Sequence, residues 1–446
     1  MNRLTKTAWL GIVLSTFALP SIAQMDTQDK EGLLLSLEEA LNKASSEGYE
    51  VRLSRQQQRA AKAGMQQANA VFLPRISIEE AAVKTNDPIG VFGIKLRQGI
   101  ITQADFAPAN LNAPDATHNF TTKVEVVQPI LNAEGLFKRS ASTYQYTSAA
   151  SQLNATLEYT KLKVKELYYQ LSMKDLQLEV LEKHLATTQA FKKQVSDYME
   201  QGMVSKAEYL QASVSVLNTE RELLKAKNQR DSVNDRLLML MGMKSTYTIQ
   251  TTNKLETAAS GSLSLPEEYS NSSLLALENR MKASGQMLKA AKSGFLPTLT
   301  VFGAYELHAS GAFGNDADNY MVGASLKWDL FKGMKQTGLV SQRKAELKQS
   351  ELQYEQHRLQ HEFKINEARR SLGEALQSVE LMEASIEQSE EDLRIRNDRY
   401  QQGLEKTADV LLAETKNLEN KLRWLQALYQ YHISIATLEY LLEEQL

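Results

Sequence analysis

Internal repetition is the sequence feature that most constrains the fold of this 446-residue chain. A Phe-Leu-Pro motif that ends at Pro74 returns with its end at Pro297. A second segment, residues 202–212, returns as residues 403–413 with Gly, an acidic residue and Ala at the same places. A repeat fixes architecture more firmly than local propensity does, so we expect one structural unit to occur twice.

The repeated motifs divide the chain into two copies and a connection. We predict a first repeat over residues 24–244, a linker rich in Ser and Thr over 245–268, and a second repeat over 269–446. The two motifs lie farther apart in the first copy, which therefore carries an insertion. We place this insertion in residues 84–118, where Asn, Asp, Pro and Gly predict a long loop.

The first residues of the chain predict export. Arg3 and Lys6 precede an apolar run over 8–19 and then small residues, so residues 1–23 are predicted to be a secretory signal peptide. The run is too short for a membrane-spanning helix, which needs roughly 20 apolar residues. No later run approaches that length, and we expect an exported chain without a helical membrane anchor.

Composition and motifs narrow the functional classes. With 0 Cys the chain has neither a disulfide framework nor a thiolate metal site. Its formal charge is −3 and no basic block occurs, so nucleic acid is not an expected partner. No nucleophile, general base or phosphate loop stands out, and we expect neither an enzyme nor a cofactor. His357 and His361 have a spacing that zinc sites use, but no third ligand follows, and we predict no metal site there.

Strand-like sequence flanks the loop in each copy. Residues 320–330 alternate between apolar and mostly polar side chains, which is typical of a strand between two different media. Residues 120–127 alternate more weakly. Partner strands are predicted over 75–83 and 298–307, each starting after a Phe-Leu-Pro motif. Their lengths match the roughly 9 to 11 residues of a tilted membrane strand.

The rest of the chain is helical in pattern. A run over 140–202 predicts a helix of about 90 Å, with shorter returning helices over 206–240 and 407–442. Helices that start near Leu37 and Ser272 would stack on the returning helices end to end. A repeat of seven residues predicts coiled-coil-like packing. In the second copy, this repeat consists of Ile365, Leu372, Val379, Ile386, Leu393 and Tyr400.

The predicted strand count requires more than one chain. Four strands cannot close a barrel, and unpaired backbone groups at an open sheet edge cost several kcal/mol each in lipid. Three copies would supply twelve strands, within the range of membrane barrels. We therefore expect a mainly α fold with membrane β, in which each protomer has long coiled-coil-like helical hairpins and four strands. The assembly would be a trimeric twelve-stranded β-barrel continued by an α-barrel.

The duplicated motifs and the tandem layout resemble those of the TolC-like outer membrane efflux protein family. The resemblance covers essentially the whole mature chain. It implies a homotrimer in the outer membrane of a Gram-negative bacterium, with a periplasmic helical extension, that acts as a passive exit duct for efflux or type I secretion. Its implied partners are a periplasmic adaptor (a membrane fusion protein), an inner-membrane pump that supplies the energy, and outer-membrane lipid.

The resemblance also implies a gate at the periplasmic helix tips. Gly202 and Gly403 correspond to the tip turns, where Gly suits a bend between helices. Tyr400 resembles a gate tyrosine of the family, and Glu208 falls where its hydrogen-bonding acid lies. A phenol that donates to a carboxylate makes a charge-assisted bond, which is stronger than a neutral one.

Three further tip positions bear on the implied gate. Asp409 matches one member of an acidic ring that narrows the channel, and as a threefold ring it would bind cations. The next ring position is Leu412, and the tip arginine of the family is replaced by Glu405. The resemblance therefore implies a gate whose polar contacts and cation selectivity differ from those of the family pattern.

Simpler roles and other protein classes compete with this interpretation. Glu208 and Asp409 also fit carboxylates at helix starts, where the helix dipole favours negative charge, and Tyr400 also fits core packing. A periplasmic adaptor or a structural coiled-coil protein are the alternatives to a channel. An adaptor would have one hairpin between β-rich halves, and a coiled coil would not explain the alternation at 320–330.

Overall fold

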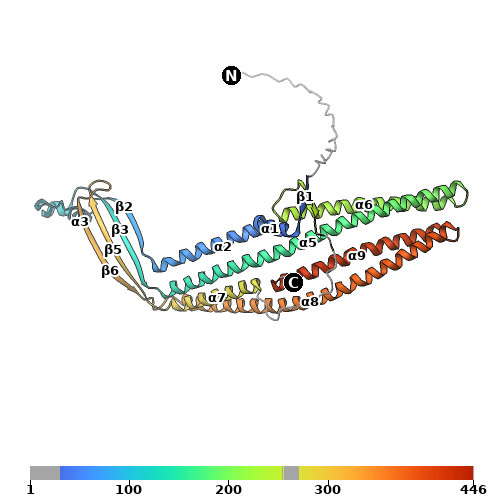
Figure 1. Ribbon diagram of the computed structural model, residues 1–446. Coiled ribbons are helices and arrows are strands. Elements are labelled where there is room, and N and C mark those ends of the chain that lie inside the picture. The colour runs from blue at the N-terminus through green and yellow to red at the C-terminus, as the bar shows by residue number, and fades with distance from the viewer. Residues whose placement is uncertain (1–30, 254, 256–270, 445–446) are drawn as a thin grey trace, which may run out of the picture.

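The computed structural model describes residues 31–253, 255 and 271–444 of the chain. Within them the molecule is long and thin, with a sheet at one end and two helical hairpins that run from it to the other end (Figure 1). The predicted signal peptide, residues 1–23, and most of the predicted linker lie outside the described residues.

A helix, a pair of strands, a very long helix and a shorter returning helix occur in both halves of the described chain. The first half contains β1 (Glu31–Leu35), α1 (Leu37–Glu47), α2 (Tyr49–Ala68), η1 (Asn69–Phe72), β2 (Arg75–Thr85), α3 (Pro88–Arg97), η2 (Gln103–Phe106), α4 (Pro108–Asn112), β3 (Thr117–Leu131), α5 (Ala133–Glu200), α6 (Lys206–Leu240) and β4 (Tyr247–Thr251). The second half contains α7 (Ser272–Ser293), β5 (Thr298–Ala309), β6 (Ala317–Lys327), α8 (Lys335–Gln401) and α9 (Thr407–Leu442).

The two hairpins confirm the predicted long helices. α5 and α8 contain 68 and 67 residues, which corresponds to about 100 Å at 1.5 Å per residue. α5 starts earlier than predicted because the side chain of Asn132 caps its first turn, accepting a hydrogen bond from the Gly135 amide at 2.9 Å. The predicted heptad residues of α8 are all buried or half-buried.

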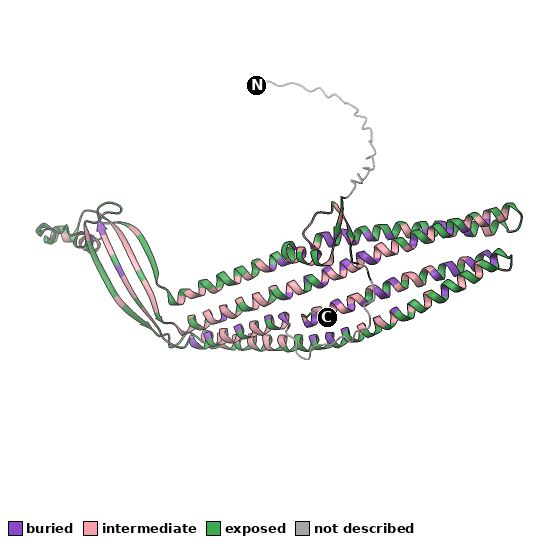
Figure 2. Cartoon of the chain, in the orientation of Figure 1, coloured by how far each residue is buried: buried purple, intermediate pink, exposed green. Residues whose placement is uncertain are grey.

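The shorter helices cover the long ones in series. α2 and then α6 lie along α5, while α7 and then α9 lie along α8 (Figure 1). The purple and pink positions in Figure 2 follow the surfaces where these helices meet. Among the described residues, no helix combines the length and the apolar composition that a membrane crossing requires.

The sheet contains all four strands that the sequence predicted. Its order is β2-β3-β5-β6, and each neighbouring pair is antiparallel. β2 and β5 begin directly after Pro74 and Pro297, as expected. β6 ends at Lys327, so the last residues of the predicted strand lie beyond the ladder.

The register gives this sheet two different faces. Side chains alternate along a strand, so residues paired across the sheet share a face. On one face, two neighbouring rows are Ile76, Val126, Gly303 and Val322, then Ile78, Val124, Tyr305 and Tyr320. On the opposite face, one row is Glu79, Lys123, Glu306 and Asn319. One face is therefore apolar and the other charged, as the period-two alternation predicted.

Two further strands correct the predicted count of four. β1 and β4 pair in parallel as a separate sheet, with Leu33 opposite Ile249. β4 lies within the stretch predicted as linker, where a strand of 5 residues gave no clear pattern. Asn234 holds β4 against α6, because its amide donates to the Tyr247 carbonyl at 2.9 Å and its oxygen accepts from the Ile249 amide at 2.8 Å. This small sheet lies where the first residues of α2 and the last residues of α6 come together along α5 (Figure 1).

The predicted long loop, residues 84–118, is partly helical rather than structureless. Pro88 at the start of α3 and the side chain of Asp87, which accepts from the Gly90 amide at 2.7 Å, form a typical helix start. Gln98 then donates to the Asn119 side chain at 2.8 Å. These contacts attach the segment to the end of the sheet.

Candidate gate at the helix tips

Each hairpin turns at a glycine with a left-handed backbone. The φ angles of Gly202 and Gly403 are 75° and 74°. The Gly202 amide donates to the Met199 carbonyl at 3.0 Å, and the Met203 amide donates to the Tyr198 carbonyl at 2.9 Å. This pair of bonds is the Schellman motif that ends many helices, and the same pair forms around Gly403. A side chain at either position would be strained, so the turns require glycine.

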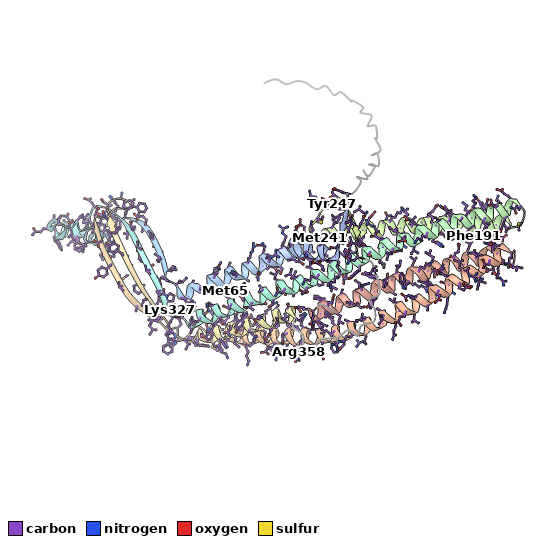
Figure 3. All side chains as sticks on the ribbon, viewed as in Figure 1. Met65, Phe191, Met241, Tyr247, Lys327 and Arg358 are labelled. Atoms are coloured by element: carbon purple, nitrogen blue, oxygen red, sulfur yellow. The ribbon has the colours of Figure 1, made fainter. Side chains whose placement is uncertain are left out.

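A buried cluster joins the two hairpins at their tips. Tyr400 is 4% exposed, and its ring centroid lies 5.2 Å from that of Phe191 and 6.0 Å from that of Tyr198. Figure 3 shows Phe191 near the helical end of the molecule, far from the sheet. Since all four hairpin helices contribute, any separation of the tips would expose this cluster. Its buried members are Phe191, Val195, Ala212, Tyr400 and Val410.

A hydrogen-bonded relay crosses the same interface. The Tyr400 hydroxyl lies 3.1 Å from the Thr407 hydroxyl, which donates to Glu208 Oε1 at 3.2 Å. An ionised carboxylate can only accept, so the Thr407 proton points to Glu208 and Tyr400 donates to Thr407. The sequence led us to expect a direct Tyr400–Glu208 bond; the structure places Thr407, which is 0% exposed, between them.

Glu208 also caps its own helix. Its Oε2 accepts from the Ser205 amide at 2.7 Å, while the Ser205 hydroxyl accepts from the Glu208 amide, which makes a capping box at the start of α6. The hydrogen bond from the Ser205 amide, together with those from the Ser205 and Thr407 hydroxyls, lowers the pKa of Glu208. The carboxylate is therefore ionised at neutral pH, as the relay requires.

The other predicted tip residues lie at the start of α9 and in the turn before it. Glu405 accepts from Arg396 at 3.1 Å and from Arg399 at 2.9 Å, so this acid is held by two arginines of α8. Asp409 lies half-buried in the first turn of α9, where a carboxylate also suits the helix dipole. Leu412 is 69% exposed.

A family comparison agrees with this architecture. The model of the family described as outer membrane efflux protein matches residues 40–243 and 268–443. The chain belongs to the outer membrane efflux protein family. This confirms the family that the duplicated motifs indicated. No curated protein sequence matches the chain.

Solved structures of outer membrane proteins have the same fold as this chain. VceC from Vibrio cholerae matches with a TM-score of 0.79 and 18% identity, over 92% of this chain and 96% of that one. The Campylobacter jejuni CmeC channel matches with a TM-score of 0.77 and 14% identity, over 91% and 85% of the two chains. The open state of the Neisseria gonorrhoeae MtrE channel matches with a TM-score of 0.72 and 12% identity, over 92% of this chain and 89% of that one. The predicted mainly helical fold with few strands is thereby confirmed.

Thr407 is the tip residue that sequence reasoning missed. Thr407 begins α9, and the equivalent residue in the first repeat is Lys206. Because the two residue types differ, comparing the repeats did not indicate a role for Thr407. A Thr at a helix start is usually explained by local capping alone. Its contact with Glu208 becomes visible only when the two hairpins are placed side by side.

The histidine pair of α8 occupies two different environments. His357 is exposed, whereas His361 is buried. In the part of the chain that the structure describes, no group of three or more potential ligand side chains could hold a metal ion.

Proposed function

We propose that this chain is one of three protomers of a passive exit duct in the outer membrane of a Gram-negative bacterium. The observation that carries the proposal is the two-faced sheet with open edges, joined to hairpins of about 100 Å. Three copies would make a twelve-stranded barrel from the sheets and a helical tube from the hairpins. Residues 1–23 would direct export, and the repeats 24–244 and 269–446 would each supply two barrel strands and one hairpin.

The apolar face of the sheet supports a location in lipid. Ile78 is 72% exposed, Tyr320 79% and Val322 77% in the single chain. Large exposed apolar surfaces are unusual on soluble monomers and typical of membrane or protein contacts. Among the described strands, β2 and β6 each leave one edge unpaired, which lipid does not tolerate, so the edges of neighbouring copies would pair.

In the proposed assembly the helix tips form the periplasmic gate. The Tyr400–Thr407–Glu208 relay and the cluster around Tyr400 would hold the closed state, with Glu405 fixing the turn before α9. Asp409 would contribute to a threefold acidic ring, and Leu412 would leave the next ring position uncharged. A periplasmic adaptor and an inner-membrane pump would engage the tips and supply the energy.

Cysteine cross-linking between edge strands tests the trimer. The chain has 0 Cys, so Ser77→Cys in β2 can be combined in turn with Asn319→Cys, Met321→Cys or Ser325→Cys in β6. These positions share the charged face, and one pair should come close enough for a disulfide, which needs Cα atoms within about 7 Å. We expect oxidised membranes to give a covalent trimer for at least one pair and none for the single variants. Exclusively monomeric chains from every pair would reject the proposed closure.

A charge on the apolar face should prevent assembly, whereas the same charge on the opposite face should not. Val322→Arg places a guanidinium toward lipid near the middle of β6, at a cost of about 2–4 kcal/mol per chain. The matched control is Ser325→Arg, which faces the charged side of the same strand. Trimer in outer-membrane fractions should be lost for Val322→Arg and retained for Ser325→Arg. Equal yields would mean that the apolar face does not meet lipid.

A further inference from the structure

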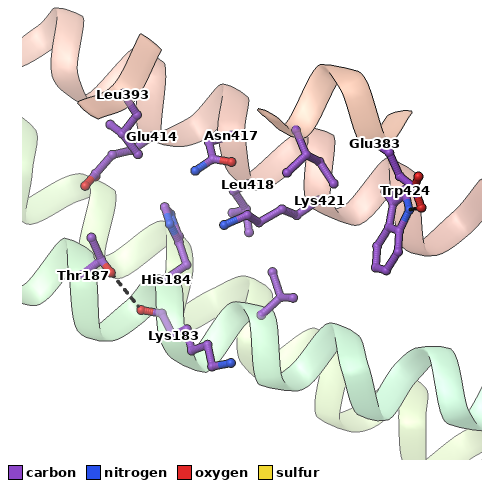
Figure 4. Close-up of a pocket in the computed structure, with 12 residues that line it drawn as sticks. Lys183, His184, Thr187, Glu383, Leu393, Glu414, Asn417, Leu418, Lys421 and Trp424 are labelled. Atoms are coloured by element: carbon purple, nitrogen blue, oxygen red, sulfur yellow. Dashed lines mark hydrogen bonds between the residues drawn. The ribbon is translucent and has the colours of Figure 1, made fainter. Parts of the chain in front are cut away.

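A pocket between the two hairpins lies away from the sheet and next to the tip cluster, which Leu393 also contacts. It has a volume of about 490 Å³ and lies between α5 on one side and α8 and α9 on the other (Figure 4). Pockets of this size hold drug-sized molecules. The wall is mixed: Val180, Ile386, Leu393 and Leu418 are apolar, and Trp424 adds an aromatic ring.

Glu414 of α9 is a buried carboxyl in this pocket. It is 3% exposed, and among the described residues its Oε2 has no hydrogen-bond partner. Figure 4 shows its side chain directed toward α5, where Thr187 and His184 lie, with Trp424 at the other end of the pocket. A buried polar atom without a partner costs free energy, so a ligand that donates a hydrogen bond to it would be stabilised.

Of the other ionisable residues that line the pocket, the two lysines are ion-paired, Glu383 is hydrogen-bonded to Trp424, and His184 is uncharged. Lys183 lies 2.7 Å from Glu179 and Lys421 lies 2.7 Å from Glu390, while Glu383 of α8 accepts from Trp424 at 3.3 Å. Burial, with a smaller contribution from Lys421, lowers the pKa of His184, which is therefore neutral near pH 7. Neither the lysines nor His184 thus supplies a free counter-charge for Glu414.

We infer that this pocket binds a small amphipathic organic cation, whose ammonium group pairs with Glu414 and whose apolar body lies against Leu418 and Trp424. An ammonium supplies both the missing donor and the missing counter-charge. An aromatic face at the opposite end suits an aromatic or aliphatic body. The site lies within one chain, so the inference goes beyond the exit duct and does not depend on the trimer.

Proton linkage gives this site a distinctive pH dependence. Burial raises the pKa of Glu414 to about 7. The ammonium pairs with the ionised carboxylate, so binding at lower pH must first release the proton. Affinity should therefore fall about tenfold between pH 8 and pH 6 for a ligand that stays charged throughout this range.

The test is a titration of the full chain in lipid nanodiscs with dansylcadaverine, a fluorescent primary amine, using empty nanodiscs as the blank. We expect saturable binding that is about tenfold weaker at pH 6 than at pH 8. Glu414→Gln keeps the shape and should weaken binding at pH 8 at least tenfold and remove its pH dependence. The matched control, Glu419→Gln, changes an exposed acid of the same helix and should bind as the unaltered chain does.

Two further measurements distinguish binding in this pocket from nonspecific adsorption of the probe to the protein or the lipid. The N-acetyl derivative of the probe has no ammonium, so its binding should be weak and independent of pH. Leu418→Phe leaves Glu414 intact and narrows the pocket, so it should also weaken binding. The inference is overturned if the unaltered chain does not bind the amine. It is equally overturned if either Glu414→Gln or Leu418→Phe binds as the unaltered chain does, or if affinity is the same at both pH values.

Discussion

Channels formed by a Thr407→Val variant should open more readily and exclude bulky solutes less well than unaltered channels. Valine keeps the size of threonine but removes the hydroxyl that accepts from Tyr400 and donates to Glu208. A neutral hydrogen bond contributes about 1 kcal/mol and one to a charged group about 1.5–3 kcal/mol, and each protomer would lose one of each. Since about 1.4 kcal/mol is a factor of ten, the ratio of open to closed channels should rise at least tenfold. Single-channel conductance in planar bilayers and cellular uptake of a bulky antibiotic measure the effect.

The matched control for this prediction is Thr415→Val in the same helix. Thr415 is exposed, and its hydroxyl donates at 2.8 Å to the Leu411 carbonyl within α9, so its loss should leave the channel unchanged. Tyr400→Phe combined with Glu208→Gln removes the two ends of the relay and should act in the same direction as Thr407→Val. Unaltered conductance in both variants would show that the relay does not hold the closed state.

Glu414→Gln should stabilise the protein above pH 7 and have little effect on its stability near pH 4. The folded state raises the pKa of Glu414 to about 7 from a usual value of 4.5, so it holds the proton more tightly than the unfolded state does. The ionised form in the folded protein is therefore penalised. This penalty is absent below about pH 4.5, grows as the pH rises, and reaches about 3 kcal/mol above about pH 7. A glutamine at position 414 cannot ionise, so the variant does not carry this free-energy penalty.

Thermal unfolding of both proteins between pH 4.5 and pH 8 measures this difference. The melting temperature of Glu414→Gln should exceed that of the unaltered chain increasingly with pH, and the gap should level off above about pH 7. Glu419→Gln again serves as the control, because that exposed acid pairs only at the surface, with Arg423 at 3.4 Å. A gap that stays constant across the pH range would mean that Glu414 is not penalised by burial.

Local patterns account for the elements that the sequence located well. The returning helices over 206–240 and 407–442 were predicted with the bounds that the structure has, because a glycine turn marks the point where each hairpin reverses. Pro74 and Pro297 fixed the starts of two strands, since a proline cannot donate within a sheet. The helices within 84–118 were missed because turn-forming residues dominate that segment and α3 is only 10 residues long.

The contacts that pair distant segments were beyond prediction. The paired residues of β1 and β4 lie 216 positions apart, from Glu31 to Tyr247, and neither strand has a pattern strong enough to be assigned by itself. A direct bond between Tyr400 and Glu208 was expected, whereas the structure joins them through Thr407, because hydrogen bonding between hairpins depends on their axial register. A shift of one residue along a helix moves a side chain by about 1.5 Å and rotates it away.

The sequence by itself determined the family, the repeated order of elements and the two faces of the sheet, because periodicity and turn residues act over a few neighbouring positions. Only the tertiary structure decided that Glu208 caps a helix, that Glu405 accepts from arginines, and that Glu414 is buried with no hydrogen-bond partner for its Oε2 among the described residues. The three are the same residue type, but Glu208 also accepts from Thr407 of the other hairpin, Glu405 accepts from two arginines of α8, and Glu414 faces a pocket. Burial and partners depend on that packing, which sequence spacing does not specify.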